Sequence, residues 1–113
     1  VNGHVVVSSS VQSIKTDAFS YCRDLKTISF ESPSQLQTIG DLAFETSGIT
    51  SVNLPASLEF IGREAFSSAN SLTAVTYECS TTASPLSVGA NAFSGTPYAT
   101  NGLLVPAPSC RTV

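Results

Sequence analysis

A six-residue pattern recurs along the sequence and constrains the fold more than any other feature. An aliphatic residue is followed five positions later by Phe, and Ala always precedes the Phe. The copies are "IKTDAF" (14–19), "IGDLAF" (39–44), "IGREAF" (61–66) and "VGANAF" (88–93). Their Phe residues follow one another at intervals of 25, 22 and 27 residues. Since a fixed period of about 20–50 residues is typical of stacked repeats, the chain is expected to fold as a solenoid.

A segment typical of a short β-strand follows each copy. Alternation of β-branched or aromatic residues with polar ones predicts half-buried strands at "LKTISF" (25–30), "ITSVNL" (49–54), "LTAVTY" (72–77) and "GLLVP" (102–106). The N-terminal "HVVVSSSV" (4–11) aligns with "SVNLPASL" (51–58) and adds a fifth strand. The strand residues expected to face the core are Leu25, Ile28, Phe30, Ile49, Val52, Leu54, Leu72, Val75 and Tyr77.

One unit cannot bury its own apolar face, so neighbouring units are expected to stack. The sequence predicts an α/β, right-handed solenoid with about five short parallel strands in one sheet and short helical or irregular turns opposite. Ile39 and Ala43 are four residues apart, a spacing that one helical turn would place on one face. The expected structural core residues are Phe19, Phe44, Phe66 and Phe93. The expected single domain covers 1–113, with the strand of a partial repeat at 1–10 and repeats at about 11–35, 36–57, 58–85 and 86–113.

The repeat pattern is most complete in two stretches, "VQSIKTDAFSYCRDLKTISF" (11–30) and "LEFIGREAFSSANSLTAVTY" (58–77). These stretches resemble the BspA-like leucine-rich repeats, whose pattern is "LxxIGxxAFxxCxxLxxIxLPxxL". Cys22 occupies the Cys position of that pattern, which implies a buried structural thiol. Lys15 stands where the other copies have Gly, which suggests that the backbone does not strictly require Gly there. The resemblance implies a leucine-rich-repeat fold and a surface or secreted protein of the kind found in bacteria and protists. Many such proteins are implicated in adhesion to host matrix proteins or to other cells.

Composition excludes several classes of function. Only 12% of residues are charged, the net charge is −3, and no run of like charges occurs, so nothing resembles a basic nucleic-acid footprint. The longest apolar runs, "VVV" and "LLV", are far too short to span a bilayer. The chain has no initiator Met, so we expect a mature protein or a fragment of a longer array.

Residue types that could carry catalysis do not cluster. Arg63 and Glu64 occupy variable positions of the repeat, which favours a solvated turn over an acid–base pair. His4 has no Asp or Glu within ten residues, and the acids are scattered over the turns. We therefore expect no enzyme and assign no catalytic, metal-binding or cofactor-binding residue.

Two cysteines suggest a disulfide. Cys79 and Cys110 each follow a predicted strand in neighbouring repeats, and adjacent parallel strands lie within disulfide reach at about 4.8 Å. The alternatives are two free thiols, or thiols that bond to a partner.

The outward positions of the strands are the expected binding face, because solenoids commonly bind through their extended sheet. These residues are small and rich in hydroxyls: Thr27, Ser29, Ser51, Asn53, Ala74 and Thr76, flanked by Val6 and Leu104. The same row could equally be inert surface. Other candidate anchors, at variable positions, are Tyr21, Phe60 and Tyr98.

The function expected from these observations is a non-enzymatic extracellular or cell-surface module for adhesion or protein binding. Its partner would be a protein, a host or matrix surface, or a glycan, with no nucleic acid and no membrane insertion. The alternative is a structural subunit of a surface assembly or filament, which would associate through unpaired terminal strands such as those around Val5 and Leu103.

Overall fold

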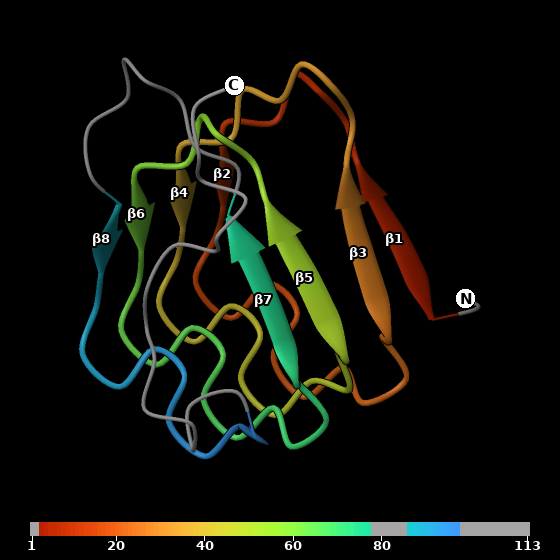
Figure 1. Cartoon of the computed structure of the whole chain (residues 1–113), viewed down its shortest axis with the longest axis vertical. Helices are drawn as coiled ribbons and strands as arrows, with labels where there is room; N and C mark the ends of the chain where they lie inside the picture. Colours follow the sequence, from red (N-terminus) through yellow and green to blue (C-terminus); the bar gives the residue numbers. More distant parts are fainter. Residues whose placement is uncertain (1–2, 78–85, 98–113) are drawn as a thin grey trace.

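The computed structural model describes residues 3–77 and 86–97. These residues form eight strands arranged as two parallel sheets (Figure 1). The first sheet has the order β1-β3-β5-β7 and contains β1 (His4–Val7), β3 (Thr27–Phe30), β5 (Ser51–Leu54) and β7 (Ala74–Tyr77). The second has the order β2-β4-β6-β8 and contains β2 (Ser13–Ile14), β4 (Thr38–Ile39), β6 (Phe60–Ile61) and β8 (Ser87–Val88). Each coil of the chain contributes one strand to each sheet, so the fold is a solenoid of parallel strands.

The structure corrects the prediction of an α/β fold with one sheet. The aliphatic residue of each copy and the residue before it form a two-residue strand, which pairs with its equivalent in the next unit, as Ile39 does with Ile61. The fold of the described residues is therefore built from strands and turns. The strand predicted at 102–106 lies outside the described residues.

Of the two expected forms for the segment that follows each short strand, helical or irregular turns, the helical one does not form. Every second amide bonds within its own turn, to the carbonyl three residues back, as Ala43 N–H does to Gly40 and Ala65 N–H to Gly62. The amides between them donate to carbonyls of the next unit. In the second unit the donor–acceptor pairs are Leu42→Arg63, Phe44→Ala65 and Thr46→Ser67, at 3.0, 2.6 and 2.9 Å. A helix satisfies its amides within its own segment, whereas here half of them join neighbouring units.

Backbone conformation explains why no helix forms there. The residue three positions after the aliphatic one has positive φ in every unit: Asp17 (62°), Leu42 (60°), Glu64 (55°) and Asn91 (58°). The residue seven positions after it does too: Tyr21 (61°), Thr46 (58°), Ser68 (61°) and Gly95 (78°). A left-handed residue interrupts a right-handed helix and is the mark of the third position of a type II turn. The segment is therefore a run of turns whose open amides face the next unit.

The four Phe rings of the repeats stack on one another through the core. Ring centroids of successive Phe residues lie 5.2, 4.9 and 5.1 Å apart, with interplanar angles of 9°, 4° and 4°. Phe44, Phe66 and Phe93 are buried, and Phe19 at the first unit is partly buried. Each such contact adds about 0.5–1.5 kcal/mol to the energy of burial.

The strand residues predicted to face inward pack in this core, and most of them are fully buried. Leu25, Ile28, Ile49, Val52, Leu54, Leu72 and Tyr77 are buried. Phe30 and Val75 are partly buried and pack against the buried cluster. One hydrophobic cluster therefore runs through all of the described units.

The Gly of "IG" is required by close approach of neighbouring backbones, which corrects the interpretation of Lys15. A Cβ added at Gly40, Gly62 or Gly89 would lie 2.6, 2.5 or 2.7 Å from a backbone nitrogen of the preceding unit. Such distances are well inside van der Waals contact. Lys15 belongs to the first described unit, where no described backbone lies behind it, and so its side chain is accommodated.

Cys22 is exposed, so the expectation of a buried thiol was wrong. Its equivalents in the later units, Ser47, Ala69 and Thr96, are all buried. Ser47 and Ala69 have described units on both sides, whereas Cys22 lies in the first described unit and has a described neighbour on one side only. Stacking on both sides therefore accounts for the burial of Ser47 and Ala69.

We predict that Phe66→Ala destabilises the fold by about 3–5 kcal/mol, because it opens a cavity and removes the ring between Phe44 and Phe93. Arg63→Ala should change the stability by no more than about 0.5 kcal/mol, because that side chain is exposed. Urea unfolding followed by circular dichroism measures both. A larger loss for Arg63→Ala than for Phe66→Ala would contradict the repeat architecture.

A second prediction concerns the Gly position. Gly62→Ala should destabilise the protein by about 1–3 kcal/mol, because the new methyl group meets the Asp41 backbone. Lys15→Ala, at the equivalent position of the first unit, is the matched control and should change stability by less than about 0.5 kcal/mol. Thermal melts compare the two. A Gly62→Ala variant as stable as the parent would show that the units are not packed this closely, since Gly→Ala otherwise stabilises by restricting the unfolded chain.

Candidate functional site

The six residues predicted as a binding face lie on three adjacent strands of the first sheet. We call this row the outer strip: Thr27, Ser29, Ser51, Asn53, Ala74 and Thr76. Strand register places Thr27, Ser51 and Ala74 side by side at one end, and pairs Asn53 with Thr76 nearer the other end. Five of the six are exposed and Thr27 is half-buried, because their side chains alternate with the buried core residues of the same strands.

Polar side chains of the outer strip bond to one another across the strands. The Thr76 hydroxyl donates to the Asn53 side-chain oxygen at 2.7 Å. The His4 ring lies across β3, with Nδ1 2.5 Å from the Thr27 hydroxyl and Nε2 3.3 Å from the Ser29 hydroxyl. These contacts hold the side chains in fixed positions relative to the sheet.

His4 is the one residue of this surface that the sequence interpretation considered only as a catalyst. The alignment of residues 4–11 with 51–58 makes His4 equivalent to the outward residue Ser51, and this was the signal that could have added His4 to the surface. The Ser29–His4 contact has the residue types of a nucleophile and a base, but a catalytic triad also needs a group that orients the imidazole. In the described structure the second ring nitrogen of His4 faces the Thr27 hydroxyl and no carboxylate. The arrangement therefore suits an ordered polar surface better than acyl transfer.

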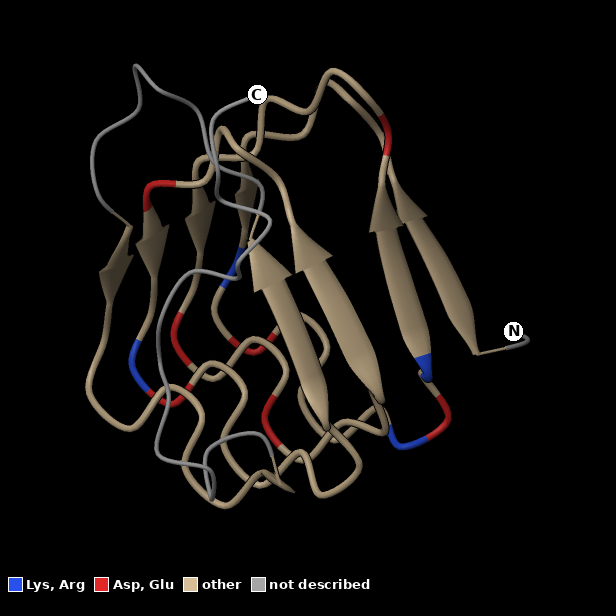
Figure 2. Ribbon diagram, viewed as in Figure 1, with Lys and Arg blue, Asp and Glu red and all other residues tan. Residues whose placement is uncertain are grey.

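The described strands of the sheet that carries the outer strip contain no Lys, Arg, Asp or Glu. Figure 2 shows Lys, Arg, Asp and Glu on the turns and connections, while the strands of both sheets contain none. A partner with strong net charge would find no complementary group on these strands. The surface instead offers hydroxyl and amide groups, which donate and accept hydrogen bonds equally well.

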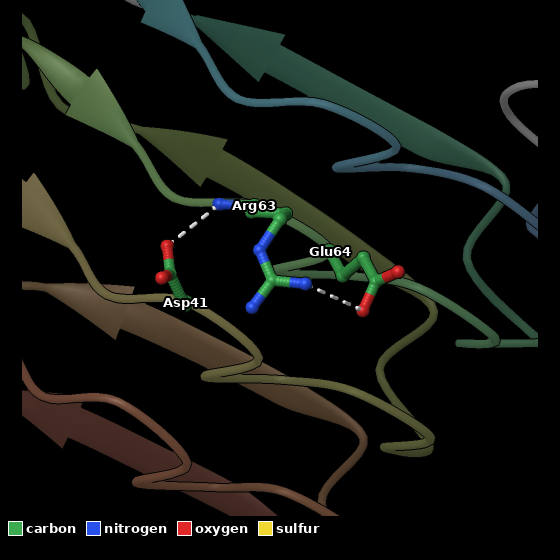
Figure 3. A network of polar contacts seen from close by, with 3 residues as sticks. All are labelled: Asp41, Arg63 and Glu64. Atoms are coloured by element: carbon green, nitrogen blue, oxygen red, sulfur yellow. Dashed lines mark hydrogen bonds and ion pairs between the residues drawn. The ribbon is translucent and has the colours of Figure 1, made fainter.

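The charged pair of "IGREAF" lies away from the outer strip, on the turn after β6. The Arg63 guanidinium is 3.8 Å from the Glu64 carboxylate, and both are substantially exposed (Figure 3). The shorter contact is made by the backbone: Arg63 N–H donates to the Asp41 carboxylate at 2.8 Å. Because exposed ion pairs contribute little, Asp41 and the Arg63 amide connect the units, and the guanidinium adds little to them.

The remaining candidates lie elsewhere. Tyr21 and Phe60 are 61% and 40% exposed, on a turn and on β6 respectively, so they do not belong to the outer strip. Cys79, Cys110, Tyr98 and Leu104 lie outside the described residues, so the predicted disulfide stays a prediction.

Within residues 3–77 and 86–97, no group of three or more His, Cys, Asp or Glu side chains is placed to hold a metal ion. This part of the chain contains no helix with the length and apolar character required to cross a bilayer.

Comparisons with known proteins agree with the repeat architecture. A protein-family model described as the BspA type leucine rich repeat region matches residues 3–103 in 6 copies. Among solved structures, the crystal structure of the pneumococcal vaccine antigen PcpA matches with a TM-score of 0.70 and 30% sequence identity. That match covers 83% of this chain and 28% of the PcpA chain, so the present sequence spans under a third of its relative. A comparison with the curated proteins gave no match. The matched family model covers most of the sequence, and the chain belongs to the BspA-type leucine-rich repeat family.

Proposed function

We propose that this chain is a non-enzymatic binding or adhesion module that works outside the cell or at its surface. The outer strip is the surface that contacts the partner, which is a protein, a matrix surface or a glycan. The observation that carries this proposal is the fixed, uncharged row of hydroxyl and amide groups on β3, β5 and β7. Such a row is preorganised, since little side-chain freedom is lost when a partner binds.

The comparisons support an extracellular setting. PcpA is described as a vaccine antigen, and an antigen of that kind is useful where antibodies reach it. A solenoid of this family also presents an extended sheet suited to large partners. The outer strip has no Trp or Arg, so we expect modest affinity per site and stronger binding where several modules act together.

The alternative function, a subunit that assembles end to end, has one observation in its favour. The first unit leaves an apolar hollow of about 350 Å³ next to Val5, Phe19 and Leu25. Two observations weigh against it. Lys15 occupies the position where stacking of a further unit requires Gly, and Phe93, at the other end of the ring stack, is only 4% exposed. The adhesion module is therefore the better supported of the two.

A blocking variant tests the proposed function. Asn53→Arg/Thr76→Arg introduces long charged side chains on the outer strip and should lower affinity for an immobilised partner at least tenfold, or about 1.4 kcal/mol. Ser87→Arg, an exposed position on β8 of the second sheet, is the matched control and should leave affinity within about twofold. Biolayer interferometry against a panel of fibronectin, collagen, laminin and immobilised glycans supplies the measurement.

Two outcomes would count against the proposal. Absence of binding by the parent protein to every member of the panel would remove adhesion as its function. Equal loss in the Ser87→Arg variant would show that the outer strip is not the contact surface. Light scattering on the same samples separates the alternative, because an end-to-end assembly grows with protein concentration and a monomeric module does not.

A further inference from the structure

The first sheet is not uniformly paired, and the interruption lies between β3 and β5. Four residue pairs join β1 to β3, and four join β5 to β7. Only two, Thr27↔Ser51 and Ile28↔Val52, join β3 to β5. The carboxyl ends of these two strands diverge in Figure 1. The sheet is thus open at one place, near the Ser29 and Asn53 end of the outer strip.

The connections after the two strands differ in length and sequence. Pro55 follows β5 directly and has no amide proton, so the ladder cannot extend beyond Leu54. The connection after β3 spans 31–35 and contains Pro33, whereas its equivalent after β5 spans only 55–57. The longer connection leads the chain out of β3 along a path that its neighbour does not follow.

A cavity of about 310 Å³ lies in this opening between the two strands, and we call it the β3–β5 cleft. One wall is the end of β3 with its connection, including Phe30 and Pro33, and the other is the end of β5 with Pro55 and Ala56. Pockets that hold small molecules have volumes of about 300–1,000 Å³. The β3–β5 cleft is at the lower limit of that range and so suits a ligand of one or two rings.

Hydrogen-bonding groups surround the cleft in defined orientations. The Ser57 hydroxyl donates to the Leu36 carbonyl at 2.7 Å, so its oxygen lone pairs are left to accept. The Ser34 hydroxyl accepts from the Leu36 amide at 3.1 Å, so its proton is left to donate. Ser29, Ser32 and Asn53 add further hydroxyl and amide groups at the rim. The cleft therefore presents donors and acceptors together.

The chemistry of the walls indicates a neutral ligand. Among the described residues, no Lys, Arg, His, Asp or Glu lines the β3–β5 cleft, so a charged ligand would lose hydration there without a counter-charge. Phe30, Pro33 and Pro55 form an apolar surface beside the polar rim. A sugar ring combines these properties, since its hydroxyls project from the edge and its C–H groups form apolar faces.

Strand order argues against an extended peptide as the occupant. A peptide that adds to a sheet as a new strand needs an open sheet edge. Both β3 and β5 are inner strands of the order β1-β3-β5-β7, and their paired residues close the cleft at one end. A compact ligand fits such a wedge, and a continuous strand does not.

We infer that the β3–β5 cleft is a binding site for one or two neutral sugar residues, such as the terminal residues of a glycan. The inference rests on the proposed function in that it names the chemical class of partner that the outer strip receives. Ser29 and Asn53 belong to both surfaces, so a longer glycan or glycoprotein seated in the cleft extends over the strip.

The test uses lactose, maltose, cellobiose and N-acetyllactosamine with the isotope-labelled chain. Titration followed by amide NMR should move the signals of Ser29, Ser32 and Ser57 with saturation in the millimolar range, which corresponds to about −4 kcal/mol. The signals of Ser51 and Ala74, at the paired end of the outer strip, should move far less. Ser29→Phe should abolish the response by filling the mouth of the cleft. Ser51→Phe, the same change on the same face at a paired position, should retain it.

The outcomes of the titration separate the sugar site from the proposed adhesion function. No saturable shift with any of these sugars, or an unchanged response in Ser29→Phe, would overturn the sugar site, while adhesion to a protein partner could still hold. Loss in both variants would place the contact on the open strip and not in the cleft. Sialyllactose serves as the charged comparison, and tighter binding of it than of lactose would contradict the neutral site. Sugar binding together with no adhesion to any surface would leave the cleft intact and remove only the proposed function. If the shifts appear instead with a Ser-rich peptide alone, the occupant is a peptide and the inference fails.

Discussion

The fold depends on backbone hydrogen bonds that join each repeat directly to the next. Parallel strands lie about 4.8 Å apart, and the stacked Phe rings repeat at nearly the same distance, 4.9 to 5.2 Å. Strands, turns and rings therefore share one spacing. That spacing leaves no room for a side chain where the backbones of two stacked units approach most closely, and Gly40, Gly62 and Gly89 occupy these points. It also requires the amides of the turn segments to point along the stack, and the residues with positive φ provide that orientation.

This constraint shapes the surface that the protein presents. Side chains that point outward from the strands are fixed by a rigid backbone, and several of them bond to one another, as Thr76 does to Asn53. Charged residues are confined to turns and connections, where they do not interrupt the strands (Figure 2). The result is an ordered face whose described strands carry no Lys, Arg, Asp or Glu. Where the pairing of β3 and β5 stops, the same face opens into a cleft.

Much of the fold could be predicted because its signals are periodic in the sequence. The recurrence of Ala-Phe indicated the repeat, and alternation in "ITSVNL" placed Val52 inward and Asn53 outward, where they lie. The second sheet could not be predicted in this way, because a two-residue strand such as Thr38–Ile39 is too short to show alternation. The turns were misjudged for another reason: Leu42 and Glu64 adopt positive φ without the Gly or Asn that usually signals it.

Other features depend on neighbours that a single repeat does not reveal. Lys15 departs from the repeat at the Gly position and Cys22 matches it at the Cys position, but the need for Gly at the one and burial at the other depend on the neighbouring units. The outer strip was predictable as an outward row, whereas His4 beside it was not assigned to that surface. The β3–β5 cleft was not predictable, since it depends on two connections of different length, 31–35 and 55–57, that diverge in space.

Native-state hydrogen exchange tests the central claim most directly, residue by residue. If turn amides join the units, the amides of Phe44 and Phe66 should be protected as strongly as the amide of Val52 on β5, an inner strand of the first sheet. All three amides exchange only when neighbouring units separate. The exposed Arg23 amide, which bonds only within its own turn, is the internal comparison and should exchange sooner. Exchange of Phe44 and Phe66 at the rate of Arg23, with Val52 still protected, would show that the turns do not bind the repeats together.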